Sequence, residues 1–271
     1  MTDDGRLSWE PTIERYLAHL AGTGRSTETV KQRRAQLTRL ARDLGAASPS
    51  DVTLVLVEQW LAVQDWSHST RRGHVAALKG YFRWLEREGL VQRSPVDDLA
   101  VVGITRPNPR PVPETGYQFA LQVADDRERL MLRLAGEAGL RRGEVAQVHT
   151  RDVVEDLLGR SLIVHGKGGK QRIVPLKADL AAELLALPPG YVFPGAIDGH
   201  LSPAYVAKRV RRLLPEGYSM HKLRHRFGSK AYAVSGDLAA VQDLLGHESP
   251  VTTRLYVKVP DAPKRAIVDA I

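Results

Sequence analysis

The sequence predicts a mainly α-helical protein with a small β component, an α+β fold divided between two domains. Apolar residues recur every three or four positions over most of the 271 residues, as expected of amphipathic helices. Only residues 161–176 read as two β-branched runs around a glycine-rich turn, which is typical of a hairpin. Four alternating prolines between residues 104 and 115 predict a break between the domains.

The first predicted domain, residues 1–103, consists of helices. The apolar spacing predicts four of them, over residues 9–22, 26–44, 53–64 and 70–88. Thr53 is suited to cap the third helix at its start, and Gly89 to end the fourth. These elements form one helical domain.

The proline-rich stretch 104–115 carries prolines at positions 107, 109, 111 and 113. Alternating prolines favour an extended backbone and act as a semi-rigid spacer. We therefore expect a linker here, followed by a second domain over residues 116–271.

The second predicted domain is mostly helical around the 161–176 hairpin. Helices are expected over 116–124 and 127–138, from about residue 141, and over 178–186, 202–214, 221–235 and 237–245. The tail, residues 261–271, is short and amphipathic. No internal repeat or low-complexity tract interrupts the sequence.

Composition and charge narrow the class of protein. No run of eighteen apolar residues and no secretory signal occurs, so we expect a cytoplasmic protein without a membrane span. The absence of cysteine excludes disulfides, thiolate metal sites and cysteine nucleophiles. Residues 1–100 hold 14 Lys and Arg against 13 Asp and Glu, whereas residues 101–271 hold 25 against 18. This basic excess favours a polyanionic partner, most commonly nucleic acid.

Two predicted helices of the first domain carry basic clusters that could face phosphates. In the second cluster, basic residues recur at seven and four positions, opposite Val75, Leu78 and Phe82. The alternative is that both clusters are simply solvated helix faces. The candidate DNA-binding residues are Arg33, Arg34, Arg71, Arg72, Lys79 and Arg83.

Four stretches of the second domain place charged or nucleophilic residues in otherwise apolar or turn-like surroundings. In AGEAGLRRGEVAQV, Arg141 precedes Glu144 by three residues, an arrangement that is also common in structural ion pairs. The hairpin HGKGGKQRIVPL presents Lys167 and Lys170 on its turn, but it lacks the spacing of a phosphate-binding P-loop. Most lysines on such turns are merely solvated.

The other two stretches lie closer to the end of the chain. MHKLRHRFGS places His221, Arg224 and His225 on one face of a helix. Neither a cysteine nor a suitable carboxylate stands nearby to complete a zinc site, so no metal is expected. LLGHESPVTTRLYVKV then contains His247 and Tyr256, nine residues apart.

Together these residue types meet the needs of phosphodiester transfer to a tyrosine. Two arginines can hold the nonbridging oxygens of one phosphate and stabilise the charge that grows in the transition state. Histidines and a lysine can donate hydrogen bonds or move protons. A tyrosine has an ordinary pKa of about 10, so cationic neighbours are needed to favour its nucleophilic form. The candidate catalytic residues are Arg141, Lys167, His221, Arg224, His247 and Tyr256.

The chain resembles the tyrosine recombinase family, which includes phage integrases and Xer-type recombinases. The strings GLRRGE, GKGGKQRIVPL, HKLRH and LLGHESPVTTRLY are similar to its four motifs, in the same order, and the resemblance covers nearly the whole chain. It implies a helical core-binding domain and a catalytic domain that form a clamp around DNA, and a site-specific recombinase that cleaves and rejoins DNA strands without metal or cofactor.

By this resemblance, Tyr256 forms a 3′-phosphotyrosyl link while Arg141 and Arg224 hold the phosphate. Lys167 is the general acid, with Lys170 as the alternative, and His221 and His247 assist. Glu144 orients Arg141. The implied partners are double-stranded DNA with inverted-repeat core sites, three further copies in a homotetramer, in which the 261–271 tail docks on a neighbour, and an accessory directionality factor where one exists.

Three questions stay open at this stage. The first predicted helix begins by residue 9, so we expect a minimal recombinase without an arm-binding domain, of phage or Xer type, acting at the nucleoid of a bacterial host. A type IB topoisomerase uses a similar residue set but usually departs at the HKLRH motif. A DNA-binding module with a decayed site is the non-enzymatic alternative.

Overall fold

The computed structural model describes residues 7–100, 103, 110–166 and 169–246. Its contacts divide the chain into two compact units, Met1–Arg106 and Pro107–Ile271, which are described separately below. The predicted linker lies partly outside the described residues, and helix α5 begins at Glu114, within the stretch expected to be linker.

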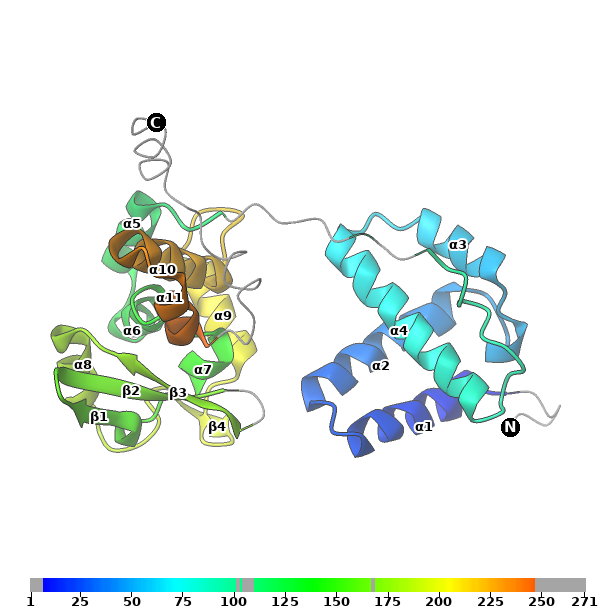
Figure 1. Cartoon of the computed structure of the whole chain (residues 1–271), viewed down its shortest axis with the longest axis horizontal. Coiled ribbons are helices and arrows are strands. Elements are labelled where there is room, and N and C mark those ends of the chain that lie inside the picture. Colours follow the sequence, from blue (N-terminus) through cyan, green and yellow to red (C-terminus); the bar gives the residue numbers. More distant parts are fainter. Residues whose placement is uncertain (1–6, 101–102, 104–109, 167–168, 247–271) are drawn as a thin grey trace. The chain divides into compact units, whose positions relative to one another are not determined.

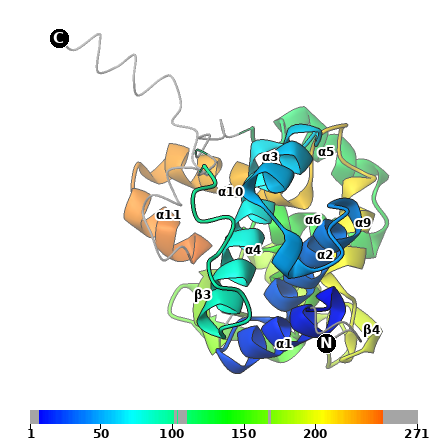
Figure 2. The same cartoon turned by 90° about the vertical axis from the view of Figure 1, so that its right-hand side faces the viewer.

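In its described residues, the first unit contains four α-helices and one short 3-10 turn (Figures 1 and 2). The four predicted helices are confirmed within two residues at each end. Thr53 caps the third by accepting a hydrogen bond from the Leu56 backbone N–H, and Gly89, at φ 69°, follows the fourth. The elements are α1 (Trp9–Gly22), α2 (Thr27–Asp43), η1 (Pro49–Asp51), α3 (Leu54–Ala62) and α4 (His68–Arg87).

Helix α4 supplies much of the core of the first unit. Its residues Val75, Leu78 and Phe82 are all buried, as their spacing predicts. Tyr81 on the same helix packs edge-on against Tyr16 of α1 and shares a 2.6 Å hydrogen bond with a threonine hydroxyl of that helix. Aromatic packing and this buried hydrogen bond therefore join the first and last helices of the unit.

The part of the second unit that the structure describes combines seven α-helices with a small sheet (Figure 1). Its elements within the described residues are α5 (Glu114–Val123), α6 (Asp126–Gly136), α7 (Arg142–Ala146), η2 (Thr150–Asp152), β1 (Val153–Asp156), β2 (Gly159–His165), β3 (Gln171–Pro175), α8 (Ala178–Leu185), β4 (Pro194–Ile197), α9 (Pro203–Arg211), α10 (Met220–Ser235) and α11 (Leu238–Leu245). This mainly helical architecture with a small β component confirms the predicted fold class.

The sheet is antiparallel with the strand order β1-β2-β3. The β2–β3 hairpin is the predicted one, and Leu162 stands opposite Val174 in its register. The alternating pattern buries both residues against the helices. Strands β1 and β4 were not predicted, because each has only four residues and shows no alternation long enough to identify a strand.

The core of the second unit is centred on helix α6. Leu132, Leu134 and Ala135 have no exposed surface, and α10 and α9 pack against this helix. Helix α11 packs against α10 and against β3. Helix α11 therefore connects the hairpin with α10, the helix that carries the candidate residues His221 and Arg224.

None of the helices in the described part of the chain has the length and apolarity that a bilayer crossing requires.

Candidate active site

Arg141 stands at the N-cap position of helix α7, directly after a sharp turn. Gly139 makes this turn with φ 68°, in the left-handed region that favours glycine. A Cβ atom there would lie 2.4 Å from the Phe227 ring, so a larger residue would clash as well. The turn leads the chain out of α6 and leaves the Arg141 side chain 43% exposed, accessible to a ligand.

Glu144 is the central carboxylate of the site. Its side chain is only 5% exposed and accepts hydrogen bonds from the Arg141 backbone N–H and from Arg141 Nη1, both at 2.7 Å. It also accepts a two-pronged pair of bonds from Arg172 Nη1 and Nη2, both at 2.8 Å. Burial raises the pKa of Glu144, but these partners, Arg172 first, outweigh it and bring the pKa to about 2. Glu144 is therefore a fixed negative charge that orients two arginines.

Arg224 lies on helix α10 and is almost fully buried, with 1% of its side chain exposed. Its guanidinium donates hydrogen bonds to the backbone carbonyls of Gly139 and Leu245, and its Nη1 atom lies 3.8 Å from Glu144 Oε2. Backbone from two distant parts of the chain thus holds this side chain beside the same carboxylate.

The carboxyl end of helix α11 is where the three arginines meet. Arg172 Nε donates to the Leu244 carbonyl at 2.9 Å, Arg224 to that of Leu245, and Arg141 Nη2 to that of Gly246 at 3.1 Å. The carboxyl end of a helix has carbonyls without partners in the helix and carries a partial negative charge. Guanidinium groups donate hydrogen bonds to these carbonyls and neutralise part of the charge. The site is consequently a cationic group gathered around the last turn of α11.

His221 lies one residue after the start of α10, on the same helix as Arg224. Although the residue is exposed overall, loss of water around its ring lowers its pKa, and the charges of Arg224, Lys222 and Arg141 lower it further. The lowered pKa favours the neutral imidazole at pH 7. His225 packs edge-on against it, with ring centroids 4.9 Å apart.

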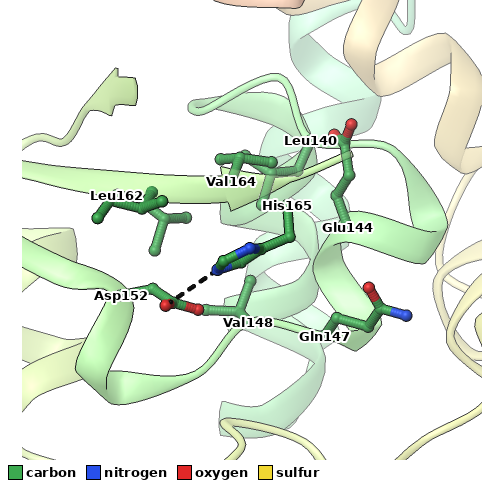
Figure 3. Close-up of a pocket in the computed structure, with 9 residues that line it drawn as sticks. Leu140, Glu144, Gln147, Val148, Asp152, Leu162, Val164 and His165 are labelled. Atoms are coloured by element: carbon green, nitrogen blue, oxygen red, sulfur yellow. Dashed lines mark hydrogen bonds and ion pairs between the residues drawn. The ribbon is translucent and has the colours of Figure 1, made fainter. Parts of the chain in front are cut away.

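The β2–β3 hairpin is braced beside its turn by a histidine at the end of β2. His165 Nε2 lies 3.1 Å from Asp152 Oδ1 (Figure 3). Its Nδ1 atom lies 3.2 Å from Gln171 Nε2. The ring lines a cavity of about 10 Å³, which has room for about one water molecule and none for a ligand. The hydrogen bond from the Gly166 N–H to the Lys170 carbonyl, at 2.7 Å, closes the turn. These contacts hold the described part of the hairpin in place beside its turn.

Three of the predicted catalytic residues, Lys167, His247 and Tyr256, lie outside the described residues. The structure brings the other three, Arg141, His221 and Arg224, into one group. Across the described ranges, no cluster of three or more potential metal ligands occurs. The arrangement can bind an anion, and its acid–base groups include a histidine with a lowered pKa.

Arg172 is the main residue that was not singled out from the sequence. It shares a sheet face with buried Val174, two residues on, and so occupies an inward-facing position of β3. A charged residue at an inward-facing position of a strand is the signal that could have identified it. His165 was also missed, because it is a single histidine at the end of a strand without any spacing pattern.

The basic residues of helix α2 mostly contact the first unit itself. Arg33 Nη1 donates to Gln36 and to the Gly73 carbonyl of α4, at 2.8 and 2.9 Å. Arg34 forms an ion pair with Glu14 of α1. Both contacts link helices, and a DNA-binding role for these arginines remains a prediction.

The basic residues of helix α4 differ from one another. Arg71 donates to the carbonyls of Leu61, in the last turn of α3, and of Gln64, just after that helix. Lys79 and Arg83 both contact residue 97, through the backbone carbonyl and the carboxylate respectively. Arg72 is exposed. Arg83 is exposed as well but is paired with Asp97, so Arg72 is the member of this group best placed to reach a ligand.

Comparison with known proteins gives a consistent result. Residues 114–262 match the Phage integrase family. A tyrosine recombinase XerC of Rhodospirillum centenum is 31% identical over an alignment of 279 positions, gaps included, and the alignment covers 90% of this chain and 81% of the relative. Sequence similarity thus extends beyond the second unit.

Two solved structures show the same fold. XerH site-specific recombinase bound to difH substrate in a pre-cleavage complex is 19% identical and has a TM-score of 0.70, covering 97% of this chain and 98% of its own. A lambda integrase tetramer bound to a Holliday junction is 20% identical and has a TM-score of 0.73, covering 92% of this chain and 80% of its own.

Proposed function

This chain belongs to the Phage integrase family and is a site-specific tyrosine recombinase, and from this premise we propose the role of each residue in its active site. The observation that carries the proposal is the convergence of Arg141 and Arg224 on the last carbonyls of α11. These residues come from helices far apart in the sequence, yet both reach the backbone immediately before His247. Chain connectivity therefore brings the two arginines to the start of the segment that carries Tyr256.

In the proposed cleavage step, the Tyr256 phenolic oxygen attacks the scissile phosphorus while its proton passes to a histidine, His221 or His247. The bond from phosphorus to the 5′-oxygen breaks, and a 3′-phosphotyrosyl link forms. Lys167 donates a proton to the departing 5′-oxygen, which becomes a free hydroxyl. Rejoining reverses the step, since a 5′-hydroxyl attacks the link and releases the tyrosine. No cofactor and no metal ion enters this scheme.

Arg141 and Arg224 act on the nonbridging phosphate oxygens. Arg141 is open to a ligand, and Glu144 fixes its direction. Arg224 adds a second positive charge, and preorganised cations of this kind stabilise the charge of a phosphoryl-transfer transition state. Neutral His221 is suited to donate a hydrogen bond or accept a proton, with His247 as a second such group.

The general acid can be identified by a direct comparison. We expect Lys167→Ala to slow cleavage strongly and Lys170→Ala to slow it less. A substrate whose 5′-bridging oxygen is replaced by sulfur releases a thiolate that needs no proton, so it should restore the rate of the true general-acid variant. Rescue of Lys170→Ala alone would reverse the assignment.

We propose double-stranded DNA with inverted-repeat core sites as the substrate and a homotetramer as the active assembly. The DNA complexes formed by XerH and by lambda integrase, which share this fold, support both. The two units are proposed to hold the duplex as a clamp. Helix α4 contributes Arg72 to DNA binding, together with the other basic residues predicted above. The same proposal includes a phage or Xer role, an accessory directionality factor, and action at the nucleoid in the bacterial cytoplasm.

The 261–271 tail, which lies outside the described residues, is proposed to join neighbouring protomers. A chain that ends at residue 260 should bind one DNA site with unchanged affinity but form fewer tetramers on paired sites. Gel shifts at increasing protein concentration separate the two effects. Equal assembly by the shortened chain would contradict this role.

The decisive experiment is covalent capture. Wild-type protein and the Tyr256→Phe variant are mixed with sheared genomic DNA of the host and denatured in detergent, and the DNA attached to protein is sequenced. We expect attachment only with wild type, enriched at one inverted-repeat sequence. Attachment without sequence preference would favour a type IB topoisomerase. No attachment by a protein that still binds DNA would favour a binding module.

A further inference from the structure

Arg172 of strand β3 connects three parts of the active site. Its two Nη atoms bind the carboxylate of Glu144 on α7, and its Nε atom binds the Leu244 carbonyl at the end of α11. Its side chain is only 12% exposed. One arginine therefore ties the hairpin strand, the central carboxylate and the last turn of α11 together.

The contacts of Arg172 distinguish it from the arginines that are proposed to bind phosphate. Each of its three side-chain nitrogens already donates to a protein oxygen at 2.8–2.9 Å. Arg141 is 43% exposed, against 12% for Arg172. A phosphate can consequently reach Arg141 without breaking any contact of Arg172, which points to an indirect role for the latter.

The packing around Arg172 is as close as its hydrogen bonding. Gly246 ends α11 with φ 60°, and a Cβ atom at this glycine would lie 2.8 Å from Arg172 Cδ. The stem of the arginine thus fills the space beside the helix end. Both ends of the side chain are fixed, which is the condition for holding a neighbour to within a fraction of an ångström.

We propose that Arg172 is a positioning residue, which holds Glu144 and the end of α11 in the arrangement that presents Arg141 to the scissile phosphate. The inference rests on the proposed role of Arg141 and deepens the function proposed above. Arg172 acts through Glu144 and does not itself contact the DNA.

Loss of Arg172 also changes the charge balance at Glu144. Burial raises the pKa of this carboxyl, and Arg172 is the largest of the influences that lower it. Without Arg172, we expect the pKa of Glu144 to rise, and the carboxyl to take up a proton as the solution becomes acidic. The charged and titratable groups that face Glu144 from the packed elements are Arg141, Arg172, Arg224, His165 and Asp152.

The test compares the rates of covalent attachment to sheared host DNA for wild type and Arg172→Met between pH 8 and pH 5. We expect the variant to be slower by about tenfold or more at pH 8, because Arg141 is misplaced. The variant-to-wild-type ratio should fall by a further factor of about three towards pH 5, because Glu144 becomes protonated. Arg172→Lys, which keeps the charge, should be slow at pH 8 but show little of the additional fall.

Arg133→Met is the matched control. Its side chain is 13% exposed and donates to carboxylates of α8, so its loss perturbs the fold to a similar degree without touching Glu144. The ratio of the attachment rate of Arg133→Met to that of wild type should not depend on pH. The double variant Glu144→Gln with Arg172→Met should also lose the additional fall, and it removes the buried unpaired charge if the single variant folds poorly.

A second measurement separates this inference from the proposed function. Phenylglyoxal modifies exposed arginines, and peptide mass spectrometry gives the rate at Arg141 without any DNA. We expect this rate to change at least twofold in Arg172→Met and to stay the same in Arg133→Met. If wild type forms no covalent adduct, the proposed function fails and the labelling alone decides the positioning role. Unchanged labelling, or an adduct ratio that stays constant with pH, would overturn it.

Discussion

Replacing Glu144 by glutamine should weaken the second unit in a pH-dependent way. The pKa of this buried carboxyl is lowered from 4.5 to about 2, so folding is favoured by roughly 3 kcal/mol when the group is ionised. Because the folded pKa is the lower one, this stability is fully present above about pH 5 and is lost as the pH falls towards 2. About 1.4 kcal/mol of it should be gone by pH 3.5.

Urea unfolding at pH 7, 5, 4 and 3.5 measures this contribution. Glu144→Gln should cost about 3 kcal/mol at pH 7, and the difference from wild type should shrink by about half at pH 3.5. Far-UV circular dichroism follows both units, whereas tryptophan fluorescence follows only the first, which contains all four tryptophans. They are Trp9, Trp60, Trp66 and Trp84.

Glu114→Gln serves as the comparison for this prediction. Its carboxyl also has a pKa lowered to about 2, through Gln118 and then Arg226 and Lys230, but half of its side chain is exposed. Water screens such an exposed ion pair, so loss of the Glu114 carboxylate should change the pH dependence of the unfolding free energy less than loss of the Glu144 carboxylate does. A Glu144→Gln cost below 1 kcal/mol at pH 7, or one that is equal at pH 7 and pH 3.5, would refute the reasoning.

Three further predictions follow from individual contacts. In urea unfolding, Gly246→Ala should destabilise the protein more than Gly236→Ala. Both glycines end helices with positive φ, which costs about 1 kcal/mol for alanine. Only an alanine at position 246 would also clash with a packed side chain, that of Arg172. Arg71→Ala should lower the stability of the first unit, whereas Arg72→Ala should leave it unchanged and reduce the salt dependence of DNA binding by about one phosphate contact in filter-binding titrations. His165→Phe should speed amide hydrogen exchange in the β2–β3 hairpin without changing the global unfolding free energy by more than about 1 kcal/mol.

Much of the fold was predictable because its helices carry local signals. Thr53 and Gly89 are a capping residue and a terminator whose effects depend on neighbouring backbone alone, and the structure confirms both. Strand β1 was not predictable, because its four residues, of which only Val153 is buried, form a strand through pairing with β2. Elements defined by distant partners leave little trace in their own sequence.

The candidate site, too, was predictable where residues carry a local motif and not where a residue matters through distant contacts. Arg141, His221 and Arg224 were identified by motif, and the structure places them together. Arg172 was not, since its importance lies in contacts with residues 28 and 72 positions away. A motif records which residues recur, whereas the shared carboxylate at Glu144 is a property of the folded chain.

The end of α11 has a consequence for how freely this region can change in sequence. Three guanidinium groups donate hydrogen bonds to backbone oxygens there, at residues 244, 245 and 246. Every amino acid supplies such an oxygen, so the side chains at the first two positions are constrained only by packing. The backbone conformation of this helix end is what must be kept, and of the three residues Gly246 is the one whose replacement disturbs it directly. A designer who replaces the segment after α11 should therefore keep the helix end together with the proposed catalytic residues His247 and Tyr256, and can vary the other residues of that segment.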